Sequence, residues 1–108
     1  MRKIELYKGS VEPFIITMPT IEGSSLASAS WKLKVWASEC ITIKKSEAIR
    51  IADDQYKVYV DTALIDKGTV RMQLLIDMID VDYASGVRPQ MPIYETNYVV
   101  VDSPFKDK

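Results

Sequence analysis

Apolar and polar side chains alternate with a period of two along much of this chain, and this alternation constrains the fold more than any other feature. Segments 31–35, 56–60 and 70–78 each place an apolar residue at every second position. Segment 94–100 alternates as well, but neighbouring aliphatic residues make it apolar on both faces. Because successive side chains of a strand point to opposite faces, the pattern predicts half-buried strands, with the last one buried on both sides.

Four shorter segments are also predicted strands and bring the count to seven or eight: 3–7, 14–18, 39–43 and 48–51. The stretch 80–92 contains a glycine and two prolines, and it is predicted to be a long hairpin loop. Segments 46–52 and 62–67 are shorter than the roughly 12 residues that an independent helix needs. The pattern therefore predicts an all-β fold, an immunoglobulin-like β-sandwich of seven to eight strands.

Length and composition favour one domain. The chain has 108 residues, of which 47% are hydrophobic and 27% charged, as in ordinary globular proteins. A domain of this size buries roughly 60–70% of the surface that its unfolded chain exposes. We predict a single sandwich domain over residues 1–102, followed by a polar tail over 103–108.

Charge and cysteine content narrow the partners and the compartment. The net charge is −1, and the basic residues are dispersed along the sequence, so we expect no nucleic-acid partner. No apolar run approaches the roughly 20 residues of a membrane helix, and the N-terminal residues lack the apolar core of a signal peptide. Cys40 is the single cysteine, so no internal disulfide forms, and we predict that it packs in the interior. We expect synthesis in a reducing cytosol, with later assembly into a virion left open.

The residue inventory argues against catalysis. The chain has no histidine, which removes Ser-His-Asp and Cys-His mechanisms and histidine-ligated zinc. No glycine-rich phosphate loop or nucleophile elbow is present. We therefore predict that the protein is not an enzyme and needs no cofactor.

Three aspartates form the sharpest local cluster: Asp77, Asp80 and Asp82. Closely spaced oxygen ligands can bind calcium, but the EF-hand pattern fails at Ala84 and lacks its distal glutamate. The favoured interpretation is a solvated loop whose aspartates cap turns and keep a sheet edge soluble, with a metal site as the weak alternative.

Two aromatic residues are candidates for a binding surface. Trp36 falls on the strand face that carries Lys32 and Lys34, whereas Trp31 falls on the apolar face and is predicted to be core. Tyr59 falls on the more polar face of its own strand. If those two strands are neighbours, Trp36 and Tyr59 could form an exposed platform for a protein or a sugar. A strand bulge that returns Trp36 to the core is the alternative.

The order of segments supports a family resemblance. An opening Ile4–Ser10 leads into the apolar 14–16, and a Lys67-Gly68 corner precedes the long strand 70–79, the loop 80–89 and the closing strand 95–101. This order resembles the immunoglobulin-like modules of phage tail and baseplate proteins, in particular the N-terminal domain of upper baseplate proteins. It is also similar to short stand-alone versions among prophage genes of gut Bacteroidetes. The similarity spans roughly residues 3 to 101, although the segment 85–88 departs from related loops in length and charge.

The resemblance implies a virion structural or accessory protein that oligomerises or docks onto a neighbour. The sequence thus predicts a non-enzymatic assembly module whose partners are other protein subunits, reached through strand edges and the loop 80–92. The predicted interaction residues are Trp36, Tyr59, Tyr83 and Arg88. A carbohydrate- or cell-surface-binding sandwich that uses Trp36 and Tyr59 is the runner-up, and a small enzyme that works through the acidic loop is the weakest interpretation.

Overall fold

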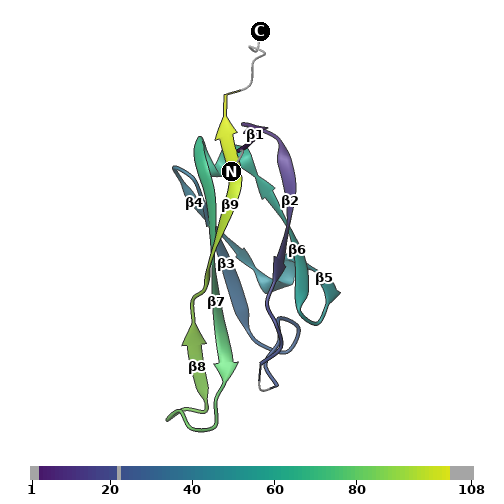
Figure 1. Cartoon of the computed structure of the whole chain (residues 1–108), viewed down its shortest axis with the longest axis vertical. Coiled ribbons are helices and arrows are strands. Elements are labelled where there is room, and N and C mark those ends of the chain that lie inside the picture. The colour runs from purple at the N-terminus through teal and green to yellow at the C-terminus, as the bar shows by residue number, and fades with distance from the viewer. Residues whose placement is uncertain (1–2, 22, 103–108) are drawn as a thin grey trace.

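Two β-sheets pack face to face in the computed structural model, which describes residues 3–21 and 23–102 (Figure 1). The larger sheet has the order β1-β9-β7-β3-β4, with β8 paired to β7, and its strands are β1 (Ile4–Tyr7), β3 (Trp31–Trp36), β4 (Cys40–Lys44), β7 (Gly68–Ile79), β8 (Val87–Gln90) and β9 (Ile93–Val101). The smaller sheet has the order β2-β6-β5, with strands β2 (Val11–Thr17), β5 (Ile49–Ala52) and β6 (Gln55–Asp61). The predicted tail 103–108 lies outside the described residues.

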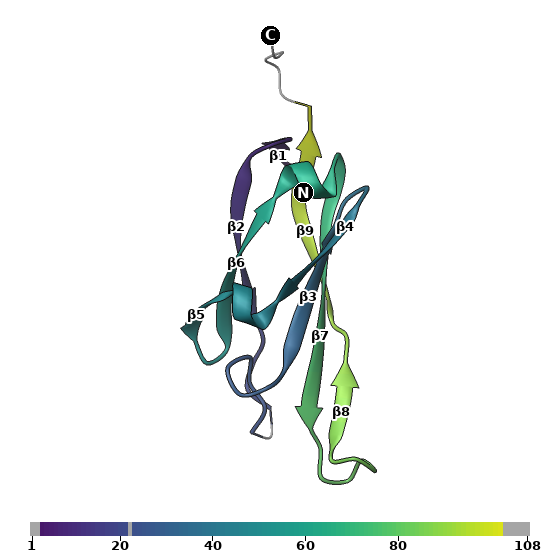
Figure 2. The same ribbon diagram turned by 180° about the vertical axis from the view of Figure 1, so that it is seen from behind.

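The two packed sheets confirm the predicted all-β sandwich. Strand β1 runs parallel to β9, and the remaining pairs are antiparallel. The chain crosses from β4 to β5 through a short 3-10 turn, η1 (Lys45–Glu47), and returns from β6 to β7 through a single helical turn, α1 (Thr62–Ile65) (Figure 2). Both helical pieces are only a turn long, in keeping with the short segments from which they fold.

Proline positions explain where pairing stops. The amide of Leu74 donates to the carbonyl of Pro92, so residue 92 faces β7, where its missing N–H leaves the ladder incomplete. Strands β8 and β9 share one register along β7 and are separated only at this point, so they act as one interrupted strand. The amide of Asp80 donates to the carbonyl of Gly86, so in this register the backbone groups of even-numbered residues of β8 point toward β7. The backbone of the odd-numbered Pro89 therefore points away from β7. The loop predicted over 80–92 therefore contains a strand, and only residues 80–86 form the turn.

Inward-facing residues of both sheets form one core. The predicted alternation is confirmed: Leu33 and Val35 on β3 are fully buried, as are Val58 and Val60 on β6. Trp31 is core, as predicted, and its indole N–H donates to the carbonyl of Leu26 at 2.7 Å.

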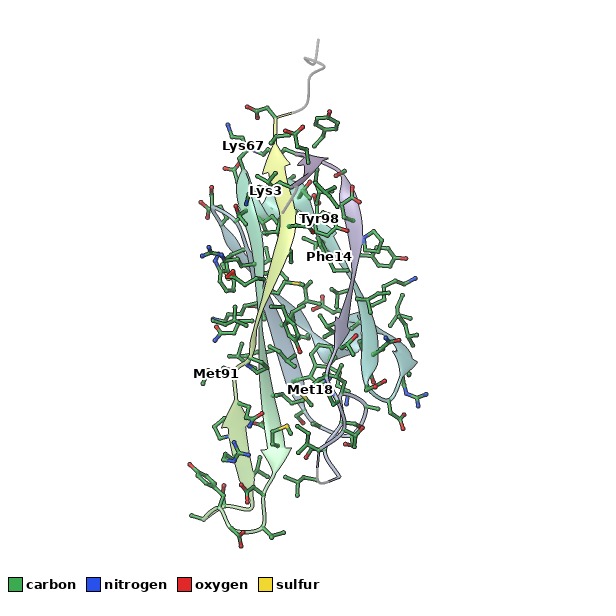
Figure 3. All side chains as sticks on the ribbon, viewed as in Figure 1. Lys3, Phe14, Met18, Lys67, Met91 and Tyr98 are labelled. Carbon is green, nitrogen blue, oxygen red and sulfur yellow. The ribbon has the colours of Figure 1, made fainter. Side chains whose placement is uncertain are left out.

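Aromatic pairs tie the two sheets together. The ring of Trp31 meets that of Tyr56 edge to face, with 5.2 Å between ring centroids. Phe14 of β2 meets Tyr98 of β9 in the same way at 5.2 Å (Figure 3). Such edge-to-face contacts favour one relative placement of the sheets over others.

No helix among the described residues has the length and apolar character needed to cross a membrane. The two helical pieces are α1 and η1, and both serve as connections between the sheets.

Candidate functional site

Strands β7 and β8 continue past the body of the sandwich as a projecting hairpin (Figure 1). We call residues 79–87 at its end the finger. The amide of Asp80 donates to the carbonyl of Gly86 at 3.0 Å, and the amide of Tyr83 donates to the carbonyl of Asp80 at 3.1 Å. Gly86 has a φ of 79°, which a glycine adopts without strain. The backbone thus closes a tight, well-bonded turn.

Of the three clustered aspartates, Asp80 stabilises the turn through its carboxylate. Arg88 donates from Nε to Oδ2 of Asp80 at 2.9 Å, and the amide of Asp82 donates to Oδ1 of Asp80 at 3.1 Å. The hydrogen bond from Arg88 is the main reason why the pKa of the Asp80 carboxyl lies below its usual value. Asp77 stands apart, exposed on the outer face of β7. Within residues 3–21 and 23–102 no three acidic, histidine or cysteine side chains are grouped as a metal site.

The finger presents apolar side chains to solvent. Val81 is 88% exposed, and Ile79, Tyr83 and Val87 are each 41–48% exposed. Ile79 and Val87 are directly paired across the hairpin, so their side chains share the outer face. The predicted interaction residues Tyr83 and Arg88 both belong to this hairpin, where Tyr83 faces solvent and Arg88 holds the turn.

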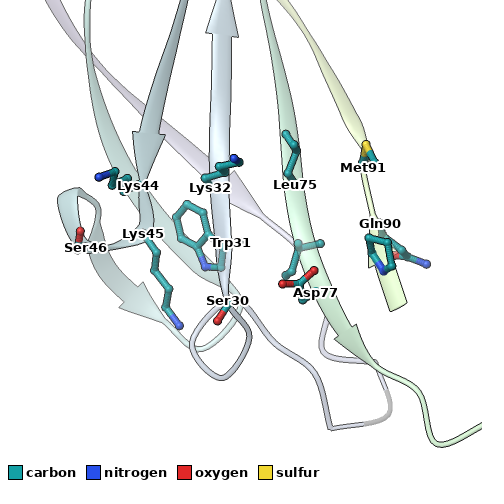
Figure 4. A pocket seen from close by; sticks show the side chains of 12 residues that line it. Ser30, Trp31, Lys32, Lys44, Lys45, Ser46, Leu75, Asp77, Gln90 and Met91 are labelled. Atoms are coloured by element: carbon teal, nitrogen blue, oxygen red, sulfur yellow. The ribbon is translucent and has the colours of Figure 1, made fainter. Parts of the chain in front are cut away.

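A groove of about 610 Å³ lies at the base of the hairpin, on the outer face of the larger sheet. We call it the lysine groove; it is lined by residues 30–32, 44–46, 75–77 and 89–91. Figure 4 shows Lys44, Lys32, Leu75 and Met91 in one row across the sheet. The lining is mainly apolar, and it includes Lys32, Lys44 and Lys45.

Lysine side chains are brought together here by strand register. Lys32 is directly opposite Lys44, and Lys34 lies two residues along on the same face. None of these three forms an ion pair in the part of the chain that the structure describes. Like charges directly opposite each other destabilise a sheet, so this arrangement favours an external anion.

The remaining charges of the groove leave this positive character in place. The ammonium of Lys45 is already bound within the chain, because its Nζ donates to the carbonyls of Ala27 and Ala29 at 2.7 Å each. Asp77 is the one acidic side chain among the lining residues. The lining of the groove is therefore net positive.

Sequence reasoning missed the lysine groove. Along the sequence Lys32 and Lys44 are separated by a turn and count as dispersed charge, and only the β3–β4 register places them opposite each other. The available signal was the alternation itself, because lysines at every second position of adjacent hairpin strands must share a face.

Trp36 and Tyr59 lie in different sheets. Trp36 is half-buried on the outer face of β3, opposite Cys40 and Arg71. Tyr59 is 51% exposed on the outer face of β6, with the ammonium of Lys57 5.4 Å from its ring centroid. Because β3 and β6 are not neighbours, the two aromatic residues do not form a shared platform.

Cys40 is exposed, so the prediction of an interior cysteine was wrong. On β4, Ile43 faces the core, and the period of two therefore places Cys40 on the outer face.

A second cleft, of about 710 Å³, separates β2 from β9 along one side of the sandwich. Thr62 N donates to Ser10 O, and Met18 N donates to Asp54 O. In the β2–β6 register, the backbone groups of even-numbered residues of β2 therefore point toward β6, and those of odd-numbered residues point to the open edge. Pro13 therefore lies on the open edge, from which it removes a donor. The Tyr94 hydroxyl donates to Thr17 O at 3.2 Å across the cleft. Partial burial raises the pKa of Tyr94 and so keeps that hydroxyl protonated. Both features disfavour addition of a strand at this edge.

Comparison of the chain with protein-family models, with curated proteins and with solved structures found no match.

Proposed function

We propose that this protein is a non-enzymatic assembly module that joins protein subunits through its finger. The observation that carries the proposal is the exposure of Val81, Tyr83, Ile79 and Val87 on one projecting, internally bonded hairpin. Soluble monomers rarely gather apolar side chains in this way unless the patch contacts a partner.

The hairpin suits insertion into a neighbouring surface. Its turn is held by backbone hydrogen bonds and by the pair between Arg88 and Asp80, so little conformational entropy is lost on binding. Burial of apolar area contributes about 25 cal/mol per Å², so Val81 and Tyr83 supply most of the attraction. A rigid aromatic residue such as Tyr83 is typical of interface hot spots.

A multi-subunit particle is the proposed setting, and a phage or prophage virion is the specific candidate. The order of the sequence segments, which resembles that of phage tail and baseplate modules, supports this candidate. The alternative of a carbohydrate-binding sandwich rested on an aromatic platform of Trp36 and Tyr59. The two residues lie in different sheets and do not form that platform.

The experiment is co-expression of the chain with the products of the adjacent genes, followed by size-exclusion chromatography with light scattering. We expect the wild-type chain to elute in a complex with itself or with one of those products. The variant V81S/Y83S should elute as a folded monomer. Ile15→Ser is the matched control, because Ile15 is 57% exposed but lies on the smaller sheet, and it should leave the complex intact.

Two outcomes contradict the proposal. One is a wild-type chain that stays monomeric alone and beside every neighbouring product. The other is a complex that survives V81S/Y83S but is lost with Ile15→Ser.

A further inference from the structure

We infer that the lysine groove of one copy receives the finger of a second copy, which gives a two-fold dimer. The inference rests on the proposed function and names the partner of the finger.

The groove selects its ligand by chemistry. Leu75 and Met91 supply an apolar wall, which suits an aliphatic side chain better than a hydroxyl-rich sugar. Lys32 and Lys44 line the groove and form no ion pair among the described residues, so a carboxylate is the complementary group. The expected ligand is therefore an exposed aliphatic side chain with an acidic neighbour.

The finger of this chain carries that ligand. Val81 is the most exposed of the large apolar side chains, at 88%, and Asp80 and Asp82 flank it. Asp80 is engaged by Arg88, whereas the Asp82 carboxylate has no ion pair within the described ranges. One unpaired carboxylate next to one exposed valine thus complements the unpaired lysines next to an apolar wall.

The placement of the two features favours a closed dimer. Finger and groove lie at the same end of the molecule, because the groove is lined by residues 89–91 at the base of the same hairpin. When two copies meet antiparallel at this end, each finger faces the other copy's groove. A two-fold axis then makes both contacts identical, as in an isologous interface.

The two kinds of contact have different roles. Burial of Val81 supplies attraction, while exposed ion pairs contribute little affinity but fix register and partner choice. Reversal of either charge should therefore weaken the dimer, and reversal of both on separate copies should restore it.

The experiment uses two variants of the full chain, Asp82→Lys and the double variant K32E/K44E. Sedimentation velocity over a concentration series should show a dimer for the wild type. Each variant alone should have a dissociation constant raised at least tenfold. An equimolar mixture should recover the dimer, because each finger then meets a groove of opposite charge. Lys57→Glu on the smaller sheet is the control for net charge and should have no effect, and far-ultraviolet circular dichroism checks that every variant is folded.

The inference is overturned if the purified wild type is monomeric at high concentration. It is also overturned if the mixture of reversed variants recovers nothing, or if the variants dimerise as the wild type does. In any of these cases, loss of co-elution with a neighbouring gene product in V81S/Y83S would still support the proposed function, so the two failures can be told apart.

Discussion

The two ends of the sandwich use their polar groups in opposite ways. At the α1 end, the buried hydroxyl of Thr62 accepts from the amide of Gly9 at 3.0 Å and donates to the carbonyl of Ser10 at 2.7 Å. There the carbonyl of Ile65 also accepts from the amides of Ser38 and Glu39, at 2.9 Å each. At the finger end, residues 80–88 form hydrogen bonds within the hairpin, and its apolar side chains face solvent. Ile79, at the base of the finger, is tied to a distant segment, because its amide donates to the hydroxyl of Ser24 at 2.7 Å.

This difference assigns stability of the fold to the α1 end and interaction with partners to the finger. Bonds between segments distant in sequence break only when the α1 end opens, so that end reports global unfolding. Side chains of the finger can be substituted without exposing the core. We therefore expect substitutions at the α1 end to alter folding and substitutions in the finger to alter association.

The largest effect should come from Ile65→Ala. Ile65 is fully buried in α1, and removing its side chain should lower the free energy of unfolding by about 2–5 kcal/mol. Leu64→Ala is the matched control, since Leu64 is 57% exposed one residue away and should change stability by less than about 0.5 kcal/mol. Urea denaturation followed by tryptophan fluorescence measures both, and equal losses would abolish the distinction.

Thr62→Val should have the next largest effect. Valine keeps the shape but removes the hydroxyl, which leaves the Gly9 amide without its partner and costs about 1–3 kcal/mol. Thr62→Ser keeps the hydroxyl and should retain more of the stability. If Thr62→Val is as stable as the wild type, the hydrogen bonds of Thr62 do not stabilise the fold.

Acid should weaken the α1 end through Asp66. The hydrogen bond from Lys8 is the main cause of its lowered pKa, and the Lys67 amide adds to the effect. A carboxyl whose pKa is lowered by folding contributes stability above its unfolded pKa, and this contribution disappears as the pH falls through the folded pKa. Thermal unfolding between about pH 6 and pH 2 should therefore lose stability less steeply in Asp66→Asn than in the wild type. Identical slopes would show that the pair between Lys8 and Asp66 is not coupled to folding.

The smallest effect on stability should come from Val81→Ser. Val81 is 88% exposed, so the substitution should change the free energy of unfolding of the monomer by less than about 0.5 kcal/mol, which thermal unfolding measures. The same variant should weaken association, which concentration-dependent light scattering measures. A large loss of monomer stability would mean that the finger is part of the folding unit.

Strand positions were predicted well because alternation reports burial directly, as Leu33, Val58 and Leu74 illustrate. Strand β8 was missed because Pro89 and Pro92 are typical of loops, although Pro89 faces away from β7. Cys40 was misplaced because residue type was weighed above its position in the alternation. The lysine groove could not be found along the sequence, since Lys32 and Lys44 meet only through hairpin register.

The amino-acid sequence by itself determined that the chain forms pleated strands with aliphatic residues inward, because a period of two is compatible with little else. Tertiary structure alone decided which strands are neighbours. That choice placed Trp36 and Tyr59 in different sheets, and it gathered the lysines beside an apolar groove at the base of the finger. The physical reason is that alternation assigns each side chain to a face of its own strand, whereas pairing and register are set by long-range packing between strands.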